Sequence, residues 1–284
     1  MVNMKDVMVV LIGNDRTHDY KINLELMRYN YSYGLDLWIT TVYNGDLNDL
    51  SSGIGENTFI YLPENRGYGY GALDGFNKGL DFARAGYRPY VAIFNFDVWF
   101  LNERGFAQAI TDFVDSGKEF SAGFHETHKW AMTDCMFFRK DFLNQILPIQ
   151  DKVLESRKQN KWLQNEMQGT ELGFENMEEW FLYSLKSNLT GKDDYGETNT
   201  QEDLELIVED IQNVWHHLER DGHPRYRFTD KYKLIHEHDW EIRKKYLIDY
   251  NQTQGHNISR LLGREIKHTK IENMRTSGGE TISV

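Results

Sequence analysis

The sequence predicts an α/β fold with a mostly parallel sheet and a mainly helical C-terminal part. Apolar runs rich in β-branched residues alternate with helical patterns in the first half, and each run ends in polar turn residues. After residue 141 the pattern becomes mostly helical. Because strand–helix–strand units join parallel strands, ligands are expected beyond the carboxyl ends of the strands.

The first strand is expected at residues 7–12, a continuous apolar run that ends at Gly13-Asn14-Asp15. Such a run is typical of a strand buried on both faces. Further strands are expected at 35–43, 59–62, 90–94, 120–125 and 134–139. Helices are expected at 20–31, 72–85, 103–116, 143–154, 178–186 and, from the spacing of Leu204, Ile207, Val208, Ile211, Trp215 and Leu218, over 204–218.

Charge and cysteine content limit the function classes. The chain has 32 Lys and Arg against 44 Asp and Glu, a net charge of -12, which disfavours nucleic acid as a partner without excluding it. Its one cysteine, Cys135, fits a reducing compartment. The apolar run near the start is too short for a membrane span and carries no leader pattern, so a cytoplasmic protein is expected.

A glycine-rich segment, NRGYGYGALDGFNKG, covers Asn65 to Gly79. Glycines at 67, 69 and 71 suit a backbone that a ligand approaches closely, and the N-terminus of the following helix can face an anion. A glycine-rich turn without a ligand is the alternative. The spacing differs from the dinucleotide-binding fingerprint.

Asn95-Phe96-Asp97 follows the strand expected at 90–94. A carboxylate directly after a buried strand lies at the sheet edge where hard cations and phosphates bind. The alternative is an Asp that caps the next turn.

Four segments in order, VVLIGNDR, VYNGD, NRGYGYGALDGFNKG and IFNFDVWF, resemble the inverting family 2 glycosyltransferases of the GT-A fold, a group that includes bacterial rhamnosyltransferase-like enzymes. The resemblance covers residues 7–140 and extends more loosely to about 250. It implies a Rossmann-like mixed sheet flanked by helices. It also implies a single domain with a donor-binding half (1–140), a mainly helical acceptor-side half (141–266) and a polar tail (267–284).

The resemblance implies a nucleoside-diphosphate sugar of the UDP, dTDP or GDP type, with Mn²⁺ or Mg²⁺ bridging its diphosphate to Asp97. A divalent ion suits this role because departure of the diphosphate builds negative charge on phosphate oxygens. Asn95 would contact sugar or ribose, and Tyr43 stands where the family commonly has an Asp, so stacking would replace that contact with the base. The other implied donor-binding residues are Asn14, Arg16, Asn44, Asn65, Gly67, Asn77 and Phe96.

Inverting transfer also needs a general base for the acceptor hydroxyl. The family takes it from an acidic pair past the metal motif, which Glu178-Glu179-Trp180 resembles; Glu179 is the expected base and Glu175 the competitor. Acids that merely decorate a helix N-terminus are the alternative. His236, with His238 second, matches a C-terminal His that reaches the metal or diphosphate. His216, His217 and His223 are expected to be structural.

The sequence therefore favours a metal-dependent inverting hexosyl- or pentosyltransferase. Its acceptor would be a hydroxyl of a surface polysaccharide or other glycan, or of a modified base in phage DNA. A nucleotidyltransferase is the alternative, although it usually has a glycine-rich loop after the first strand, and the turn at 13–16 is short. A catalytically inactive sugar-binding scaffold is disfavoured because Asp97 is retained.

Overall fold

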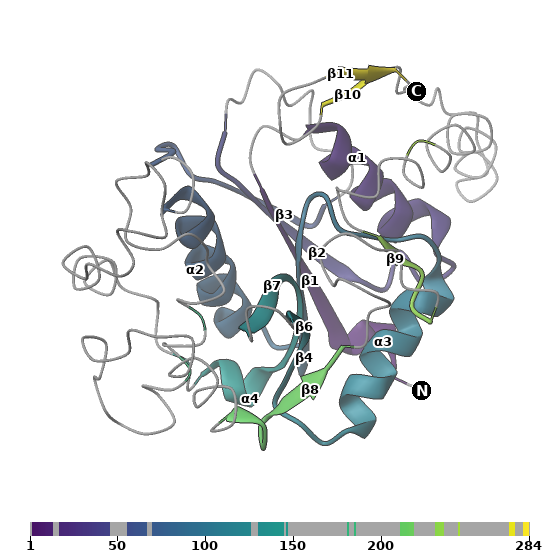
Figure 1. Cartoon of the computed structure of the whole chain (residues 1–284), viewed down its shortest axis with the longest axis vertical. Helices are drawn as coiled ribbons and strands as arrows, with labels where there is room; N and C mark the ends of the chain where they lie inside the picture. Colours follow the sequence, from purple (N-terminus) through teal and green to yellow (C-terminus); the bar gives the residue numbers. More distant parts are fainter. Residues whose placement is uncertain are drawn as a thin grey trace.

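The structure is a computed structural model that describes residues 2–13, 17–45, 56–66, 70–125, 130–144, 146, 181, 185, 211–218, 231–235, 244, 273–275 and 281–283. A seven-stranded mixed sheet forms its centre, with α2 on one face and α1 and α3 on the other (Figure 1). The predicted fold class, a mixed α/β sheet flanked by helices, is confirmed.

The sheet has the order β3-β2-β1-β4-β7-β6-β8. Its strands are β1 (Val7–Gly13), β2 (Trp38–Tyr43), β3 (Thr58–Tyr61), β4 (Tyr90–Asn95), β6 (Phe120–His125), β7 (Trp130–Arg139) and β8 (Trp215–His217). The helices are α1 (Thr17–Glu25, continued by a π-helical turn Leu26–Asn30), α2 (Tyr70–Ala85), α3 (Glu103–Asp115) and α4 (Lys140–Leu143), and a 3₁₀ turn covers Met4–Asp6. Two small antiparallel sheets pair β5 (Trp99–Phe100) with β9 (Leu234–Ile235) and β10 (Asn273–Arg275) with β11 (Thr281–Ser283).

The sheet has a topological switch point between β1 and β4, which is called the strand reversal below. Strands β1 to β4 are parallel, and the chain runs from β1 outward to β2 and β3 before it returns to β4 on the other side of β1. β7 is antiparallel to both β4 and β6. In open α/β sheets the carboxyl ends of strands on either side of such a reversal are where ligands bind. Here those ends are Gly13 and Asn95.

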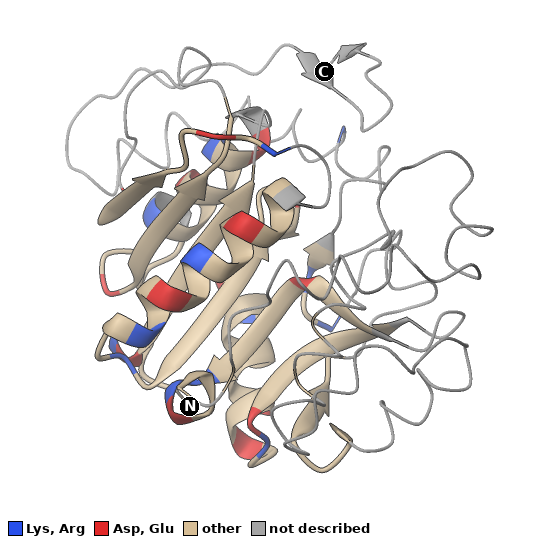
Figure 2. Ribbon diagram, turned by 90° about the vertical axis from the view of Figure 1, so that its left-hand side faces the viewer, with Lys and Arg blue, Asp and Glu red and all other residues tan. Residues whose placement is uncertain are grey.

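Both faces of the central strands are apolar. Val10, Ile12 and Ile93 belong to the cluster packed under α2, whereas Val9 and Leu11 belong to the cluster under α1 and α3. Because a strand places successive side chains on opposite faces, double burial explains the continuous apolar run of β1. Strands β1 to β4 contain no charged residue. The charged residues of α2, whose positions along the helix are coloured in Figure 2, are exposed or half-buried.

Two glycines of α2 serve helix–sheet packing. A Cβ added at Gly75 would lie 2.8 Å from Ile12 Cγ2, and one added at Gly79 would lie 3.0 Å from Val10 Cγ1. Both are closer than an ordinary carbon–carbon contact. This part of the glycine-rich segment is therefore explained by the close approach of α2 to β1, without a ligand.

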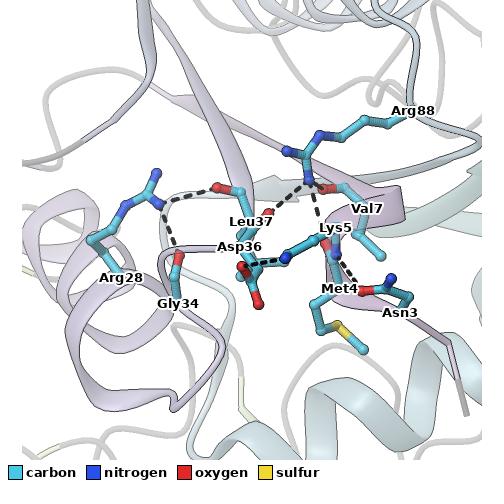
Figure 3. A network of polar contacts seen from close by, with 9 residues as sticks. All are labelled: Asn3, Met4, Lys5, Val7, Arg28, Gly34, Asp36, Leu37 and Arg88. Carbon is cyan, nitrogen blue, oxygen red and sulfur yellow. Dashed lines mark hydrogen bonds and ion pairs between the residues drawn. The ribbon is translucent and has the colours of Figure 1, made fainter.

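Two arginine side chains connect the segments at the amino ends of the parallel strands (Figure 3). Nη1 of Arg88 donates to the carbonyl oxygens of Val7 (3.0 Å) and Asp36 (2.8 Å), with a longer contact to that of Met4 (3.4 Å). Arg28 likewise donates to two carbonyls in the loop before β2. The start of β1, the approach to β2 and the approach to β4 are thus joined at the edge opposite the strand reversal.

The helix predicted over 204–218 is wrong at its end. Ile211 is helical, but Trp215–His217 forms β8, which adds to β6 in parallel. The Trp215 ring stacks on Phe120 at 5.9 Å between centroids, and its Nε1 donates to the Ala122 carbonyl oxygen. Pairing with a distant strand has overridden the helical spacing.

Other boundaries also differ from prediction. α4 ends at Leu143, where a helix was expected to begin, and Asn144 is in a turn; most of the predicted helix beyond it lies outside the described residues. Phe181 and Leu185 are helical, in agreement with the helix expected at 178–186. The polar tail contains the β10–β11 pair. Among the described helices, none is long and apolar enough to cross a membrane.

Candidate functional site

The candidate site lies at the carboxyl edge of β1, β2 and β4. Directly after β4, Val98 N–H donates to the Asn95 carbonyl oxygen (3.2 Å) and closes a turn with Phe96 and Asp97 at its centre. Asp97 is 7% exposed, and Asn95 is half-buried. The cap of α3, the next helix, is Asn102, whose Oδ1 accepts from Gly105 N–H (2.9 Å). The helix that follows the turn therefore takes its N-cap from Asn102.

A buried asparagine of α1 holds this turn. Nδ2 of Asn23 donates to the carbonyl oxygens of Phe96 (3.0 Å) and Val98 (2.7 Å), with a longer contact of 3.5 Å to that of Asn95. Nε1 of Trp99 also donates to the Phe96 carbonyl oxygen (3.1 Å). Asn23 was not among the site residues predicted from the sequence. Its only sequence signal is an amide between apolar residues of the predicted first helix.

The side chain of Phe96 is packed in the core and so fixes the position of the turn. Its ring lies 4.9 Å from that of Tyr20 and stacks on that of Tyr43 at 6.2 Å between centroids. A Cβ on Gly13 would fall within 3.0 Å of three atoms of this ring. Phe96 N–H also donates to the Ile12 carbonyl oxygen (3.0 Å). A glycine at the end of β1 is thus required by the ring that covers it.

Tyr43 and Phe96 are core residues, in contrast to their expected contact with the donor. Their exposed fractions are 0% and 1%, and the Tyr43 ring lies between Phe96 and Phe59. Stacking of Tyr43 on a base would require its ring to leave this packing. Both residues shape the site from below.

A second cluster joins the end of β2 to the start of α2. Asn44 N–H donates to the Gly13 carbonyl oxygen (3.1 Å), and its Nδ2 donates to that of Gly71 (3.1 Å). Nδ2 of Asn65 in turn donates to the Asn44 carbonyl oxygen (3.2 Å). Two of the predicted donor-binding residues, Asn44 and Asn65, are thus in direct contact.

The side-chain oxygen of Asn44 is buried and has no hydrogen-bond partner in the described part of the chain. The Nδ2 bond to Gly71 fixes the orientation of the amide, so Oδ1 is the atom left over. A buried acceptor without a partner in the protein can accept a hydrogen bond from a water molecule or from a ligand. Asn65 is exposed, and Asn77 on α2 is half-buried.

Asp134 of β7 is a second carboxylate close to the end of β4, and the sequence predicts it only as a strand residue. Phe94 of β4 lies opposite Cys135, so Asn95 and Asp134 are the next residues in the antiparallel register. Neighbours across a strand pair share a face, with Cβ atoms about 5 Å apart. Asp134 is 2% exposed. No motif marks it, because its position depends on a strand pairing across the chain.

The short sheet of β5 and β9 brings a distant segment beside the turn. Ile235 of β9 pairs with Trp99 of β5, and Trp99 is two residues after Asp97 in the sequence. Leu101 N–H also donates to the Lys233 carbonyl oxygen (2.8 Å). Figure 1 shows β9 next to α3. The segment that immediately precedes His236 in the sequence is therefore held close to the turn that contains Asp97.

Contacts with α3 hold that segment in place. The hydroxyl of Tyr232 donates to Oδ2 of Asp112 (2.9 Å), and Lys231 Nζ lies 3.2 Å from the same oxygen. Burial raises the pKa of Tyr232 to about 12. Burial acts to raise the pKa of Asp112 as well, but hydrogen bonds from Gln108, Tyr232 and Lys231 outweigh it and lower that pKa.

The remaining predicted site residues, Asn14, Arg16, Gly67, Glu175, Glu179 and His236, lie outside the described residues, as do His223 and His238. Of the predicted structural histidines, His216 shares a hydrogen bond of 2.9 Å between its Nδ1 and Ser121 Oγ across β6 and β8. Burial lowers the pKa of His217.

The residues at this edge fit a metal that binds together with a diphosphate. In the parts of the chain that the structure describes, no group of three or more His, Cys, Asp or Glu side chains is arranged to hold a metal ion. Mg²⁺ typically takes one or two carboxylates and completes its shell with phosphate oxygens and water. Asp97 meets the first requirement, and the second would come from the ligand.

Comparison with known proteins adds two distant structures. No protein-family model matches the sequence, and no curated protein matches it either. A mannosyltransferase from Pyrobaculum calidifontis, solved in complex with GDP-Man and Mn²⁺, is 12% identical over 91% of this chain and 78% of its own, with a TM-score of 0.39. S. aureus TarS is 10% identical over 52% of this chain and 31% of its own, with a TM-score of 0.37. Both scores are below 0.5, so the fold class rests on the sheet itself.

Replacement of Gly13 by Ala should destabilise the protein by about 2 kcal/mol, because the new methyl group overlaps the Phe96 ring. Urea denaturation followed by circular dichroism measures this change. Gly86→Ala, just after α2, is the matched control. Its Cβ would come no closer than 3.2 Å to a heavy atom beyond its chain neighbours, so its loss of stability should be much smaller. A loss for Gly86→Ala equal to that for Gly13→Ala would contradict this explanation of Gly13.

Proposed function

We propose that the protein is a glycosyltransferase that moves a sugar from a nucleoside-diphosphate sugar to a hydroxyl acceptor, with inversion and with Mn²⁺ or Mg²⁺. One observation carries the proposal. The four segments that resemble family 2 glycosyltransferases are far apart in the sequence, yet hydrogen bonds join them at the carboxyl ends of the strands. Phe96 bonds to Ile12, Asn44 to Gly13, and Asn65 to Asn44. These strand ends lie at the strand reversal, where α/β sheets bind nucleotides.

Different residues at the carboxyl ends of the strands would bind different parts of the donor. Asp97 would hold the metal, which when bound neutralises charge on the departing diphosphate. Asn95 contacts sugar or ribose, and the partnerless Oδ1 of Asn44 suits a hydroxyl or N–H of the nucleoside. Asn65 is exposed and lies against Asn44, so it can contact the same ligand. Because Tyr43 is buried, we assign it no contact with the base.

The second half of the chain would supply proton transfer and closure of the site. Glu179 accepts the proton of the acceptor hydroxyl as its oxygen attacks the anomeric carbon, with Glu175 as the competing base. His236 completes the site near the metal or the diphosphate. Support for this role comes from Ile235, its chain neighbour, which lies opposite Trp99 close to the turn.

A nucleotide panel tests the proposal. UDP, dTDP and GDP are each added with Mn²⁺ at about 100 times their dissociation constant, and thermal unfolding is followed. The preferred nucleotide should stabilise the protein by about 2.7 kcal/mol. Asp97→Asn should lose the Mn²⁺-dependent part of this gain, whereas Asp81→Asn on the exposed side of α2 should keep it. If no nucleotide stabilises the protein, or if Asp97→Asn behaves as wild type, the donor site proposed here is wrong.

The choice of base has its own test. Glu179→Gln removes proton acceptance but keeps the size of the side chain, so transfer should fall at least about 100-fold while nucleotide affinity changes little. Single-turnover transfer and calorimetric binding are measured on the same preparation. Glu175→Gln is the matched control and should retain most activity. The reverse pattern would assign the base to Glu175.

A further inference from the structure

Asn23 is fully buried in α1, and its amide lies against the backbone on both sides of Asp97. The Phe96 carbonyl belongs to the peptide group that precedes Asp97, and the Val98 carbonyl lies just beyond it in the chain. A single Nδ2 group at 3.0 and 2.7 Å from these two oxygens fixes the turn relative to the helix.

This asparagine is unfavourable for the helix in which it lies. Asn is a weaker helix former than the leucine and isoleucine beside it, and its Oδ1 is buried with no hydrogen-bond partner among the described residues. An apolar residue of the same size would avoid both costs. What only the amide provides at this position is a donor to the turn carbonyls.

The other contacts of the turn leave Asp97 little backbone freedom. Trp99 Nε1 donates to the same Phe96 carbonyl, and the Phe96 ring is packed against Gly13 and Tyr43. Val98 N–H closes the turn itself. The backbone on both sides of Asp97 is therefore held in place by these contacts.

We infer that Asn23 is a positioning residue for the metal: through the carbonyls of Phe96 and Val98 it holds Asp97 where the carboxylate meets the ion of the Mn²⁺–nucleotide complex. This inference rests on the proposed function. Residues that orient a metal ligand without touching the metal typically change metal affinity 10- to 100-fold when they are replaced. Asn23 and the site belong to different elements, so α1 contributes to metal binding without contacting the ion.

The test compares Asn23→Leu with Arg88→Met. Both changes remove a side-chain donor that lies against three backbone carbonyls, but those of Arg88 are at the opposite edge of the sheet. Mn²⁺ is titrated into each protein at a saturating level of the preferred nucleoside diphosphate, and free Mn²⁺ is measured by electron paramagnetic resonance. Affinity for the nucleotide without metal and thermal stability are measured in parallel.

Asn23→Leu should need about tenfold more Mn²⁺ for half-saturation, with metal-free nucleotide affinity within about twofold of wild type. Arg88→Met should lower thermal stability and leave Mn²⁺ affinity unchanged. Equal Mn²⁺ affinities for Asn23→Leu and wild type, or equal losses in both variants, would overturn the inference. Failure of wild type to bind any nucleotide with Mn²⁺ would instead overturn the proposed function, and this inference with it.

Trp99→Phe provides a second variant if Asn23→Leu does not fold. It removes the indole donor to the Phe96 carbonyl and keeps an aromatic ring in the core. A smaller rise in the Mn²⁺ requirement, about threefold, is expected because only one of the donors to the turn is lost. An unchanged Mn²⁺ requirement would show that the turn backbone does not set the metal affinity.

Discussion

The proposed site depends first on the hydrogen bonds that fix the turn between β4 and β5. Asn23 and Trp99 donate to the turn carbonyls, and the Phe96 ring is packed beneath Gly13. These contacts join α1, β1 and β4, which meet at the strand reversal. A carboxylate on a mobile turn would have to be ordered when a metal binds, at a cost in conformational entropy. Because the turn is already ordered in the folded protein, most of this loss of entropy occurs on folding and not on metal binding.

Different kinds of side chain hold the two ends of the parallel strands. At the amino edge, Arg88 and Arg28 donate to backbone carbonyls, whereas at the carboxyl edge the same task falls to the neutral amides of Asn23, Asn44 and Asn65. An amide supplies hydrogen bonds without adding a charge. Cationic ties near Asp97 would compete with a divalent ion for the carboxylate, since like charges repel strongly where solvent is scarce. The neutral amides that hold the carboxyl ends of the strands are therefore compatible with metal binding at Asp97.

Local patterns were enough to predict the doubly buried β1 and the polar residues Asn95 to Asp97 that follow β4. Features that depend on distant pairing were not predictable in the same way. Trp215 follows helical spacing but lies in a strand, because stacking on Phe120 and pairing with β6 decide its conformation. The same limit applies to Asn23 and Asp134, whose roles arise only when α1 and β7 are placed next to β4. Tyr43 had the right place in the sequence for a donor contact, but its ring is used in the core.

The most direct test of the account is a crystal structure of the protein with Mn²⁺ and the preferred nucleoside diphosphate, with the ion located by its anomalous scattering. The account predicts one Mn²⁺ at about 2 Å from a carboxylate oxygen of Asp97 and bound to both phosphates, with the Asn23 contacts to Phe96 and Val98 unchanged. A nucleotide bound elsewhere, or an ion that Asp97 does not contact, would contradict it.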